Sequence, residues 1–334
     1  MIKQENKSDS IISVEHLKLF IDGDYGMTQI LNDINFKVRA RETLGIVGES
    51  GCGKSMTALA IMRLLKSPPA RIEGNIKFCD VDILSLSTDE MRSIRGNKIS
   101  MIFQDPMTSL NPVYTIGNQL EEVFMLHQGM NRAQAKTASI ESLRTVNVAM
   151  PEKRIKDYPY QMSGGMRQRV MIAMALACNP QLLIADEPTT ALDVTIQAQM
   201  LDLMRKLRDK TGTAIMFITH DLGVISEMCE RAIVLYCGEI MEEASTKALF
   251  HSPKHPYTVG LLNALPHKGK RSGKLYVIPG IVPQAGNFPP GCVFAPRCRH
   301  AEEVCCIEKP MVTQVEEGHT IRCHLFKNEA KNHG

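Results

Sequence analysis

Apolar and polar residues alternate near the start of the chain, in two stretches at residues 12–20 and 34–38. The residues between them include the turn formers Asp22, Gly23, Asp24 and Gly26. Alternation with a period of two is typical of half-buried strands, so the pattern predicts antiparallel strands here. A short apolar run at 44–47 then leads into a glycine loop, and apolar spacing at 54–65 predicts a helix after the loop.

Helical periodicity replaces this pattern between about residues 107 and 160, where Pro112 and Pro151 bound two helical stretches. We interpret this segment as a helical insertion, with helices at 116–128 and 132–148. Strands and helices alternate after it, with helices predicted at 166–178 and 196–210 and strands at 182–185 and 214–218. This alternation predicts an α/β fold with a mostly parallel sheet.

Beyond His251 the chain becomes rich in proline and glycine, and a cluster of cysteines follows between Cys292 and Cys323. A chain of 334 residues exceeds what one hydrophobic core usually fills. We therefore expect a tail at 1–11, an α/β domain at 12–250 with a helical subdomain at about 107–165, and a C-terminal extension at 251–334.

Composition narrows the class of protein. The apolar fraction of 44% and charged fraction of 22% are those of an ordinary globular protein. The net charge of +3 is spread along the chain, so no nucleic-acid-binding face is expected. The first residues lack an apolar signal region, and apolar stretches such as 170–177 are too short to span a bilayer. We expect a chain that is neither secreted nor membrane-embedded by itself.

The loop after the third predicted strand has the spacing GxxxxGK[ST], running from Gly48 to Ser55. Glycines let backbone N–H groups and the following helix N-terminus face phosphate oxygens. The ammonium of Lys54 then faces the β and γ phosphates, and the Ser55 hydroxyl is offered to Mg²⁺. We expect nine residues to contact the nucleotide here: Gly48, Glu49, Ser50, Gly51, Cys52, Gly53, Lys54, Ser55 and Met56.

Two adjacent carboxylates, Asp186 and Glu187, end the apolar strand predicted at 182–185. Ligands bind at the carboxyl ends of strands in open α/β sheets. Asp186 is expected to hold the Mg²⁺ shell, and Glu187 to polarise the attacking water as a general base. A second anion site is predicted at Ser163, Gly164 and Gly165, where the chain enters a helix; an ordinary helix cap at Ser163 is the alternative.

Over residues 12–250 the chain resembles the ATPases of ABC transporters, in a series of ordered motifs: the phosphate loop, Gln104, Ser163 to Gly165, Asp186 and Glu187, Ala191-Leu192-Asp193, and His220. The resemblance implies an α/β P-loop ATPase domain with an antiparallel β subdomain and a helical subdomain. It also implies that two such domains close head to tail on ATP, with the Ser163 segment covering the partner's nucleotide. Met162 stands where the family usually has leucine, a volume-conserving exchange.

The resemblance further implies roles for single residues. Gln104 senses Mg²⁺ and the γ-phosphate, Asp193 contacts the partner subunit, and His220 orients the γ-phosphate. Tyr25 is expected to stack on adenine, with Phe20 as the competing ring.

Finer motifs resemble the dipeptide and oligopeptide importer branch. They are residues 103–112, His255 to Thr258, and a C-terminal segment with Cys292, Cys298, Cys305, Pro310, Cys323 and His324. This branch implies two membrane permease subunits, an extracytoplasmic peptide-binding protein and a second ATPase, a copy or a paralogue. It places the chain at the cytoplasmic face of the membrane. Nickel or antimicrobial peptides are alternative cargoes, and a soluble ABC ATPase is the rival class.

Four thiols, Cys292, Cys298, Cys305 and Cys323, are expected to converge on one centre. Four thiolates suit a [4Fe–4S] cluster or Zn²⁺, although the gaps do not match CxxC zinc spacing. The family resemblance favours the cluster; zinc and plain reduced thiols stay open, and Cys306 competes with Cys305 as a ligand. Such a centre is expected to staple a small extension rather than to transfer electrons.

Overall fold

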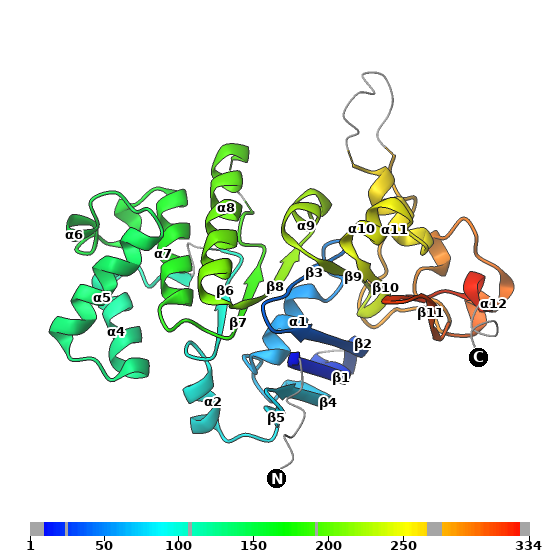
Figure 1. Cartoon of the computed structure of the whole chain (residues 1–334). Coiled ribbons are helices and arrows are strands. Elements are labelled where there is room, and N and C mark those ends of the chain that lie inside the picture. Colours follow the sequence, from blue (N-terminus) through cyan, green and yellow to red (C-terminus); the bar gives the residue numbers. More distant parts are fainter. Residues whose placement is uncertain (1–9, 24–25, 106–108, 191–192, 266–275, 328–334) are drawn as a thin grey trace, which may run out of the picture. The chain divides into compact units, whose positions relative to one another are not determined.

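The computed structural model describes residues 10–23, 26–105, 109–190, 193–265 and 276–327 (Figure 1). The chain forms two compact units. Within the described residues, the first unit holds 10–12, 38–42 and 78–218, and the second holds 13–37, 43–77 and 219–327. The two units are therefore interleaved along the sequence.

Three parallel strands form the sheet of the first unit: β6 (Ile99–Ile102), β7 (Leu182–Asp186) and β8 (Ala214–Thr219). In the register, Ile102 pairs with Ala185, and Asp186 pairs with Ile218. β7 and β8 are buried along their whole length, which explains why they appear in the sequence as continuous apolar runs. The predicted strands and their parallel order are confirmed.

Helices make up most of the rest of the first unit. They are α2 (Thr88–Ile94), α4 (Ile116–Gln128), α5 (Arg132–Thr145), α6 (Pro151–Arg154), the 3-10 helix η1 (Pro159–Gln161), α7 (Gly164–Leu176) and α8 (Val194–Thr211), with a short strand β5 (Val81–Asp82). Helices α4, α5 and α6 lie together (Figure 1). Helices α4 and α5 therefore form in the stretch where the sequence predicts two helices.

Two predicted helix ends are wrong for local reasons. Helix α5 ends at Thr145 rather than at residue 148, because Asn147 adopts a left-handed conformation with φ of 57°. Helix α7 begins at Gly164, two residues earlier than predicted, because the side chain of Ser163 accepts a hydrogen bond from the backbone N–H of Met166 and caps the helix.

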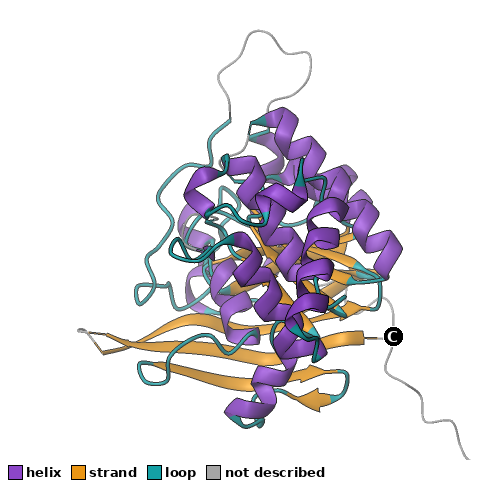
Figure 2. Cartoon of the chain, turned by 90° about the vertical axis from the view of Figure 1, so that its left-hand side faces the viewer, coloured by secondary structure: helices purple, strands orange, loops and turns teal. Residues whose placement is uncertain are grey.

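A second sheet segment organises the other unit. Strand β3 (Thr43–Val47) pairs in parallel with β9 (Arg231–Tyr236), and β9 continues through antiparallel β10 (Glu239–Ser245), β12 (His319–Arg322) and β11 (Val312–Glu316). β1 (Ser10–Gly23), β2 (Gly26–Arg39) and β4 (Ala70–Phe78) are neighbours in a separate sheet, where the two long strands run side by side (Figure 2). The predicted β-rich start is confirmed. Its first two strands extend beyond the alternating stretches 12–20 and 34–38 from which they are predicted.

The helices of this unit are α1 (Lys54–Ile61), α9 (Leu222–Met228), α10 (Thr246–His251), α11 (Pro256–Asn263), η2 (Ala295–Arg297), α12 (Glu303–Ile307) and η3 (His324–Phe326). Helix α10 contacts both β9 and β10 (Figure 1). Helix α1 is shorter than the predicted 54–65. Within the described residues, no helix is long and apolar enough to cross a bilayer.

The C-terminal stretch is attached to this unit by a strand that the sequence did not predict. In β12, Ile321 pairs with Glu242 of β10. The fully buried Glu242 carboxylate accepts hydrogen bonds from the backbone N–H groups of Lys254 and His255, at 2.7 and 2.9 Å. His319 Nε2 lies 2.7 Å from the same carboxylate. Burial alone raises the pKa of Glu242, but these hydrogen bonds hold it below its usual value, so Glu242 stays an anion. The domain boundaries expected at 12, 107, 165 and 251 remain predictions.

Candidate nucleotide-binding site

The phosphate loop connects a fully buried strand to a helix, as the sequence predicts. β3 ends at Val47, and α1 begins at Lys54 directly after Gly53. Helix α1 begins without a side-chain cap, and helix N-termini that follow a glycine loop are typical binding places for phosphate groups. The ammonium of Lys54 donates to the carbonyl oxygens of Gly48, at 2.8 Å, and Glu49, at 3.0 Å. The loop is therefore curled around its lysine, with Ser55 and Met56 in the first turn of the helix.

Two glycines of this loop are required by backbone geometry. Gly53 has a φ of 105°, a conformation that side chains disfavour. A Cβ built on Gly48 would lie 2.1 Å from the carbonyl oxygen of Leu235 and 2.8 Å from the Sγ of Cys52. Cys52 is itself buried, and burial raises the pKa of its thiol, so it acts as a small packing residue.

Glu187 lies at the carboxyl end of β7 and contacts Gln104. The amide Nε2 of Gln104 donates to Glu187 Oε2 at 3.1 Å. This contact follows from the register, because Ile102 pairs with Ala185 and both side chains come two residues later. The hydroxyl of Thr190 donates to the same Oε2 at 2.8 Å. Glu187 also adopts a φ of 46°, and its N–H donates to Ile218 at 2.8 Å. Its carboxylate is thus held in one orientation.

Thr190 and Gln168 also support the Glu187 segment, and no motif in the sequence predicts either residue. Gln168 is buried in α7 and donates from Nε2 to the carbonyl of Pro188, immediately after Glu187. The position of Thr190 is the one clue in the sequence. It lies three residues after Glu187, a spacing at which a hydroxyl can donate to the carboxylate. Asp186 is buried at the end of β7, and its carboxylate oxygens are the hard donors that Mg²⁺ prefers.

The Ser163 segment forms a helix start with one open side. Ser163 Oγ caps α7 by accepting from Met166 at 3.3 Å. Among the residues that the structure describes, nothing lies within 4 Å of a Cβ built on Gly164, whereas one built on Gly165 would lie 3.4 Å from Ile196. The packing of this chain therefore does not require glycine at position 164. Both readings of Ser163 from the sequence, helix cap and anion site, are compatible with this geometry.

The remaining predicted residues are placed as follows. Asp193 caps α8, its Oδ1 accepting from the N–H of Ile196 at 2.9 Å. His220 is exposed and follows β8. Tyr25, Ala191, Leu192 and residues 106–108 lie outside the described residues. For the competing ring, Phe20, the guanidinium of Arg71 lies 4.8 Å from the ring centroid.

The structure brings these residues together in two groups. Gln104, Asp186 and Glu187 belong to the first unit, as do the Ser163 segment and Asp193. The phosphate loop and His220 belong to the second unit. The prediction that Lys54 and Asp186 act on one nucleotide therefore remains a prediction.

The four predicted cysteines line one small cavity of about 10 Å³, together with His255, His300 and His324. Cys306 is exposed and does not line it. Burial, together with the neighbouring thiols of the group, raises the pKa of Cys292 and that of Cys323 to about 11. Thiol donors suit iron–sulfur or zinc, yet within the described ranges no three His, Cys, Asp or Glu side chains are grouped as metal ligands.

Two family models match the chain. The model described as "ABC transporter" matches residues 31–190, and that described as "Oligopeptide/dipeptide transporter, C-terminal region" matches residues 241–305. The first match covers β3, the phosphate loop and the Asp186–Glu187 pair. The second covers β10 from Met241 onward and three of the four cysteines that line the cavity, Cys292, Cys298 and Cys305.

Curated relatives match over almost the whole chain. A probable peptide ABC transporter ATP-binding protein of Sinorhizobium fredii is 51% identical over 95% of this chain and 95% of its own length. The oligopeptide transport ATP-binding protein AppD of Bacillus subtilis is 48% identical over 96% and 98%. OppD of Salmonella typhimurium is 50% identical over 90% of both chains.

Among solved structures, an ATP-binding cassette captured as a dimer in a post-hydrolysis state, bound to ADP and Pi, superposes with a TM-score of 0.63 at 29% identity. The match covers 70% of this chain and 98% of that one. One family is indicated by all of these observations: the phosphate loop, the carboxylate pair, the two family models and the relatives. The chain belongs to the ATP-hydrolysing subunits of ABC transporters, in the branch that carries the oligopeptide/dipeptide transporter C-terminal region.

Proposed function

We propose that this chain is the ATPase subunit of an importer for dipeptides or oligopeptides. The observation that carries the proposal is the match to peptide-transport ATPases over 95% of the chain, including the cysteine-bearing C-terminal region. A shared ATPase core alone does not specify cargo, whereas the C-terminal region distinguishes this branch.

The nucleotide is held, in this proposal, between two copies of the ATPase fold. The phosphate loop with Lys54 cradles the β and γ phosphates of one ATP, and Ser55 and Asp186 hold its Mg²⁺. The Ser163 segment of the facing subunit covers the nucleotide from the other side. The open space at Gly164 supports this arrangement, since no described residue lies close enough to require glycine there.

Hydrolysis is assigned to Glu187. The carboxylate, held by Gln104 and Thr190, polarises the attacking water, and His220 orients the γ-phosphate. Gln104 also reaches the Mg²⁺ and γ-phosphate, so its bond to Glu187 connects nucleotide sensing with the base. Asp193 contacts the facing subunit, and Tyr25 stacks on adenine.

The proposed partners follow from the branch. Two permease subunits contain the transport path, an extracytoplasmic protein delivers peptide, and a second ATPase, a copy or a paralogue, completes the dimer. The chain works at the cytoplasmic face of the membrane. ATP-driven closure and reopening of the ATPase pair switch the permeases between outward-facing and inward-facing states.

Purification of the complex from native membranes tests this function directly. We expect permease subunits to co-purify, and proteoliposomes of the complex with its binding protein to accumulate labelled peptide only with ATP. Transport of nickel or of an antimicrobial peptide would reassign the cargo. A chain that purifies without any membrane subunit would favour the soluble class of ABC ATPase instead.

We further propose that Cys292, Cys298, Cys305 and Cys323 hold a [4Fe–4S] cluster. Their shared cavity supports this, and when bound the cluster would staple the extension. Protein purified without oxygen is expected to contain iron and sulfide, which Cys298→Ser removes and Cys306→Ser leaves. If the protein contains zinc instead of iron, the site is a zinc site. If freshly purified protein contains neither metal, the four cysteines are reduced thiols without a bound centre.

A further inference from the structure

Arg297, a residue of the C-terminal extension, forms an ion pair with the phosphate loop. Arg297, in η2, forms a bidentate ion pair with Glu49, the second residue of the loop. Nη1 donates to Oε2 at 2.6 Å, and Nη2 donates to Oε1 at 3.1 Å. Two parallel N–H···O bonds fix both the position and the orientation of a carboxylate. A residue 248 positions away thus controls a side chain of the loop.

Every N–H of this guanidinium has a partner. Besides the two bonds to Glu49, Nη1 donates to the Tyr236 hydroxyl at 3.3 Å, Nη2 to the carbonyl of Ile278 at 3.3 Å, and Nε to the carbonyl of Pro279 at 3.0 Å. The side chain of Arg297 is only 4% exposed. An arginine with all its N–H groups bonded has one fixed orientation. It therefore also fixes the orientation of the Glu49 carboxylate to which it is bonded.

The backbone of Glu49 is held as well. Its N–H donates to the hydroxyl of Tyr257 at 2.9 Å, and Tyr257 is completely buried. The rings of Tyr257, Tyr236 and Phe294 pack with centroid distances of 4.6, 5.2 and 5.3 Å. Phe294 directly precedes η2, so one aromatic cluster supports both Arg297 and Tyr257.

The negative charge of Glu49 explains why its ion pair with Arg297 affects ATP binding. A carboxylate in a loop that binds a triphosphate repels the ligand, and the side chain is only 28% exposed to screening solvent. The guanidinium of Arg297 offsets this charge and draws the carboxylate to one side. Without Arg297, the carboxylate is free to turn toward the phosphates.

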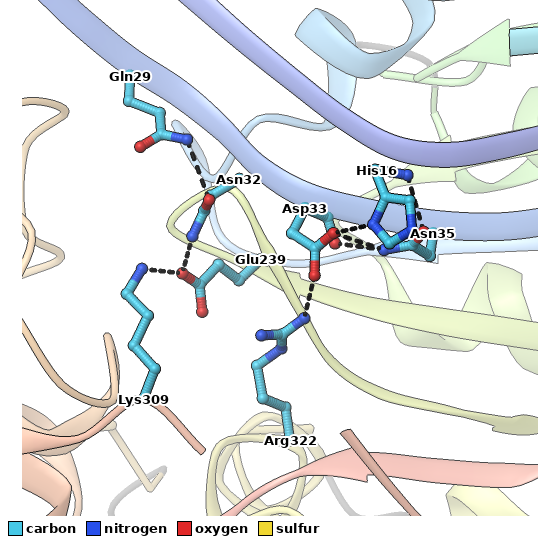
Figure 3. A network of polar contacts seen from close by, with 8 residues as sticks. All are labelled: His16, Gln29, Asn32, Asp33, Asn35, Glu239, Lys309 and Arg322. Carbon is cyan, nitrogen blue, oxygen red and sulfur yellow. Dashed lines mark hydrogen bonds and ion pairs between the residues drawn. The ribbon is translucent and has the colours of Figure 1, made fainter. Parts of the chain in front are cut away.

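The extension is attached to the same unit at a second place, shown in Figure 3. Lys309 donates to the buried carboxylate of Glu239 at 2.7 Å, and Asn32 of β2 donates to the same oxygen at 2.6 Å. Arg322 lies 3.4 Å from Asp33. These contacts attach the extension independently of Arg297, so we expect a mutation of the Arg297 pair to leave the extension attached.

We propose that Arg297 is a positioning residue for ATP binding, acting through Glu49, and that the cysteine-bearing extension thereby sets the ATP affinity of the phosphate loop. The backbone N–H of Ala295 donates to Cys292, and that of Cys298 donates to Ala295. The segment that carries Arg297 is therefore built between two of the cavity cysteines. This inference rests on the proposed role of the loop as the phosphate cradle.

The test compares ATP binding and hydrolysis in full-length variants. Arg297→Ala is expected to raise the Kd and KM for Mg·ATP by about 10- to 100-fold, with kcat changed less than about twofold. Arg297→Lys keeps the charge but loses the bidentate geometry, so its Kd is expected to lie between those of wild type and Arg297→Ala. The exposed neighbour Arg299→Ala is the matched control and is expected to bind like wild type.

A double-mutant cycle separates positioning from general destabilisation. If Arg297 acts through Glu49, the effects of Arg297→Ala and Glu49→Gln on Kd are expected to be clearly non-additive. Tyr257→Phe, which removes only a hydroxyl, covers the case in which Arg297→Ala does not fold, and should raise Kd several-fold. Wild-type Kd in Arg297→Ala or in folded Tyr257→Phe, or an additive cycle, overturns the inference. A wild-type chain that does not bind Mg·ATP overturns the proposed function instead.

Discussion

Glu187→Gln is expected to lower kcat for ATP hydrolysis by about 10²- to 10⁴-fold while Mg·ATP still binds with near wild-type affinity. The exchange removes the basic oxygen that polarises water but keeps the shape of the side chain. Hydrolysis reopens the proposed dimer, so blocking hydrolysis is expected to trap the closed pair. Steady-state phosphate release measures the first effect, and light scattering of the eluting species with and without ATP measures the second.

The structure supplies a control for this variant. Thr190 donates to Glu187 Oε2 but has no chemical role, so Thr190→Val removes an orienting contact while leaving the carboxylate basic. We expect it to lower kcat by about tenfold, far less than Glu187→Gln. Equal losses in both variants, or turnover in Glu187→Gln close to wild type, would show that Glu187 is not the base.

Register explains why part of this site was predictable. Parallel strands bring residues of equal register to one edge of a sheet, so Gln104 after β6 and Glu187 after β7 meet without further information. The phosphate loop was predictable for a similar reason, since the glycine conformations and the strand-to-helix change are local properties. Short-range pattern and strand order are sufficient for such features.

Contacts across long stretches of chain were not predictable. Arg297 and Glu49 meet across 248 positions. Strand β12, which attaches the extension to β10, appears in the sequence as a short mixed run with Ile321 as its apolar residue. Tyr257 was read as part of a branch motif, but nothing in the pattern showed that its hydroxyl faces the loop. Side-chain pairing of this kind depends on packing that no periodicity encodes.

The cysteines fall between these cases. Their convergence on one cavity was predicted from residue type and from the family resemblance, and Cys305 lines the cavity while Cys306 does not. The fold does not determine whether these cysteines bind a cluster, zinc or no metal. Residue type and the family resemblance therefore predict the donor set, and the identity of a bound centre stays a proposal that metal analysis decides.

Lys54→Met is expected to weaken Mg·ATP binding by about 10- to 100-fold and also to lower kcat, because the ammonium contacts phosphate oxygens in both the bound and the reacting nucleotide. The exchange keeps an unbranched apolar stem in a site that is 5% exposed, so the fold should survive. It also removes the bonds to the Gly48 and Glu49 carbonyls that curl the loop. Calorimetric titration gives the affinity, and a steady-state assay separates KM from kcat.

The loss of kcat distinguishes Lys54 from Arg297. A residue that acts only by holding the loop affects binding, whereas a residue that touches the phosphates affects both constants. Lys66→Met, at an exposed position after the same helix, controls for the general loss of one positive charge and is expected to leave both constants unchanged. If Lys54→Met bound and hydrolysed ATP as well as Lys66→Met does, the loop would not be the phosphate cradle, and the assignment of the nucleotide to this loop would be wrong.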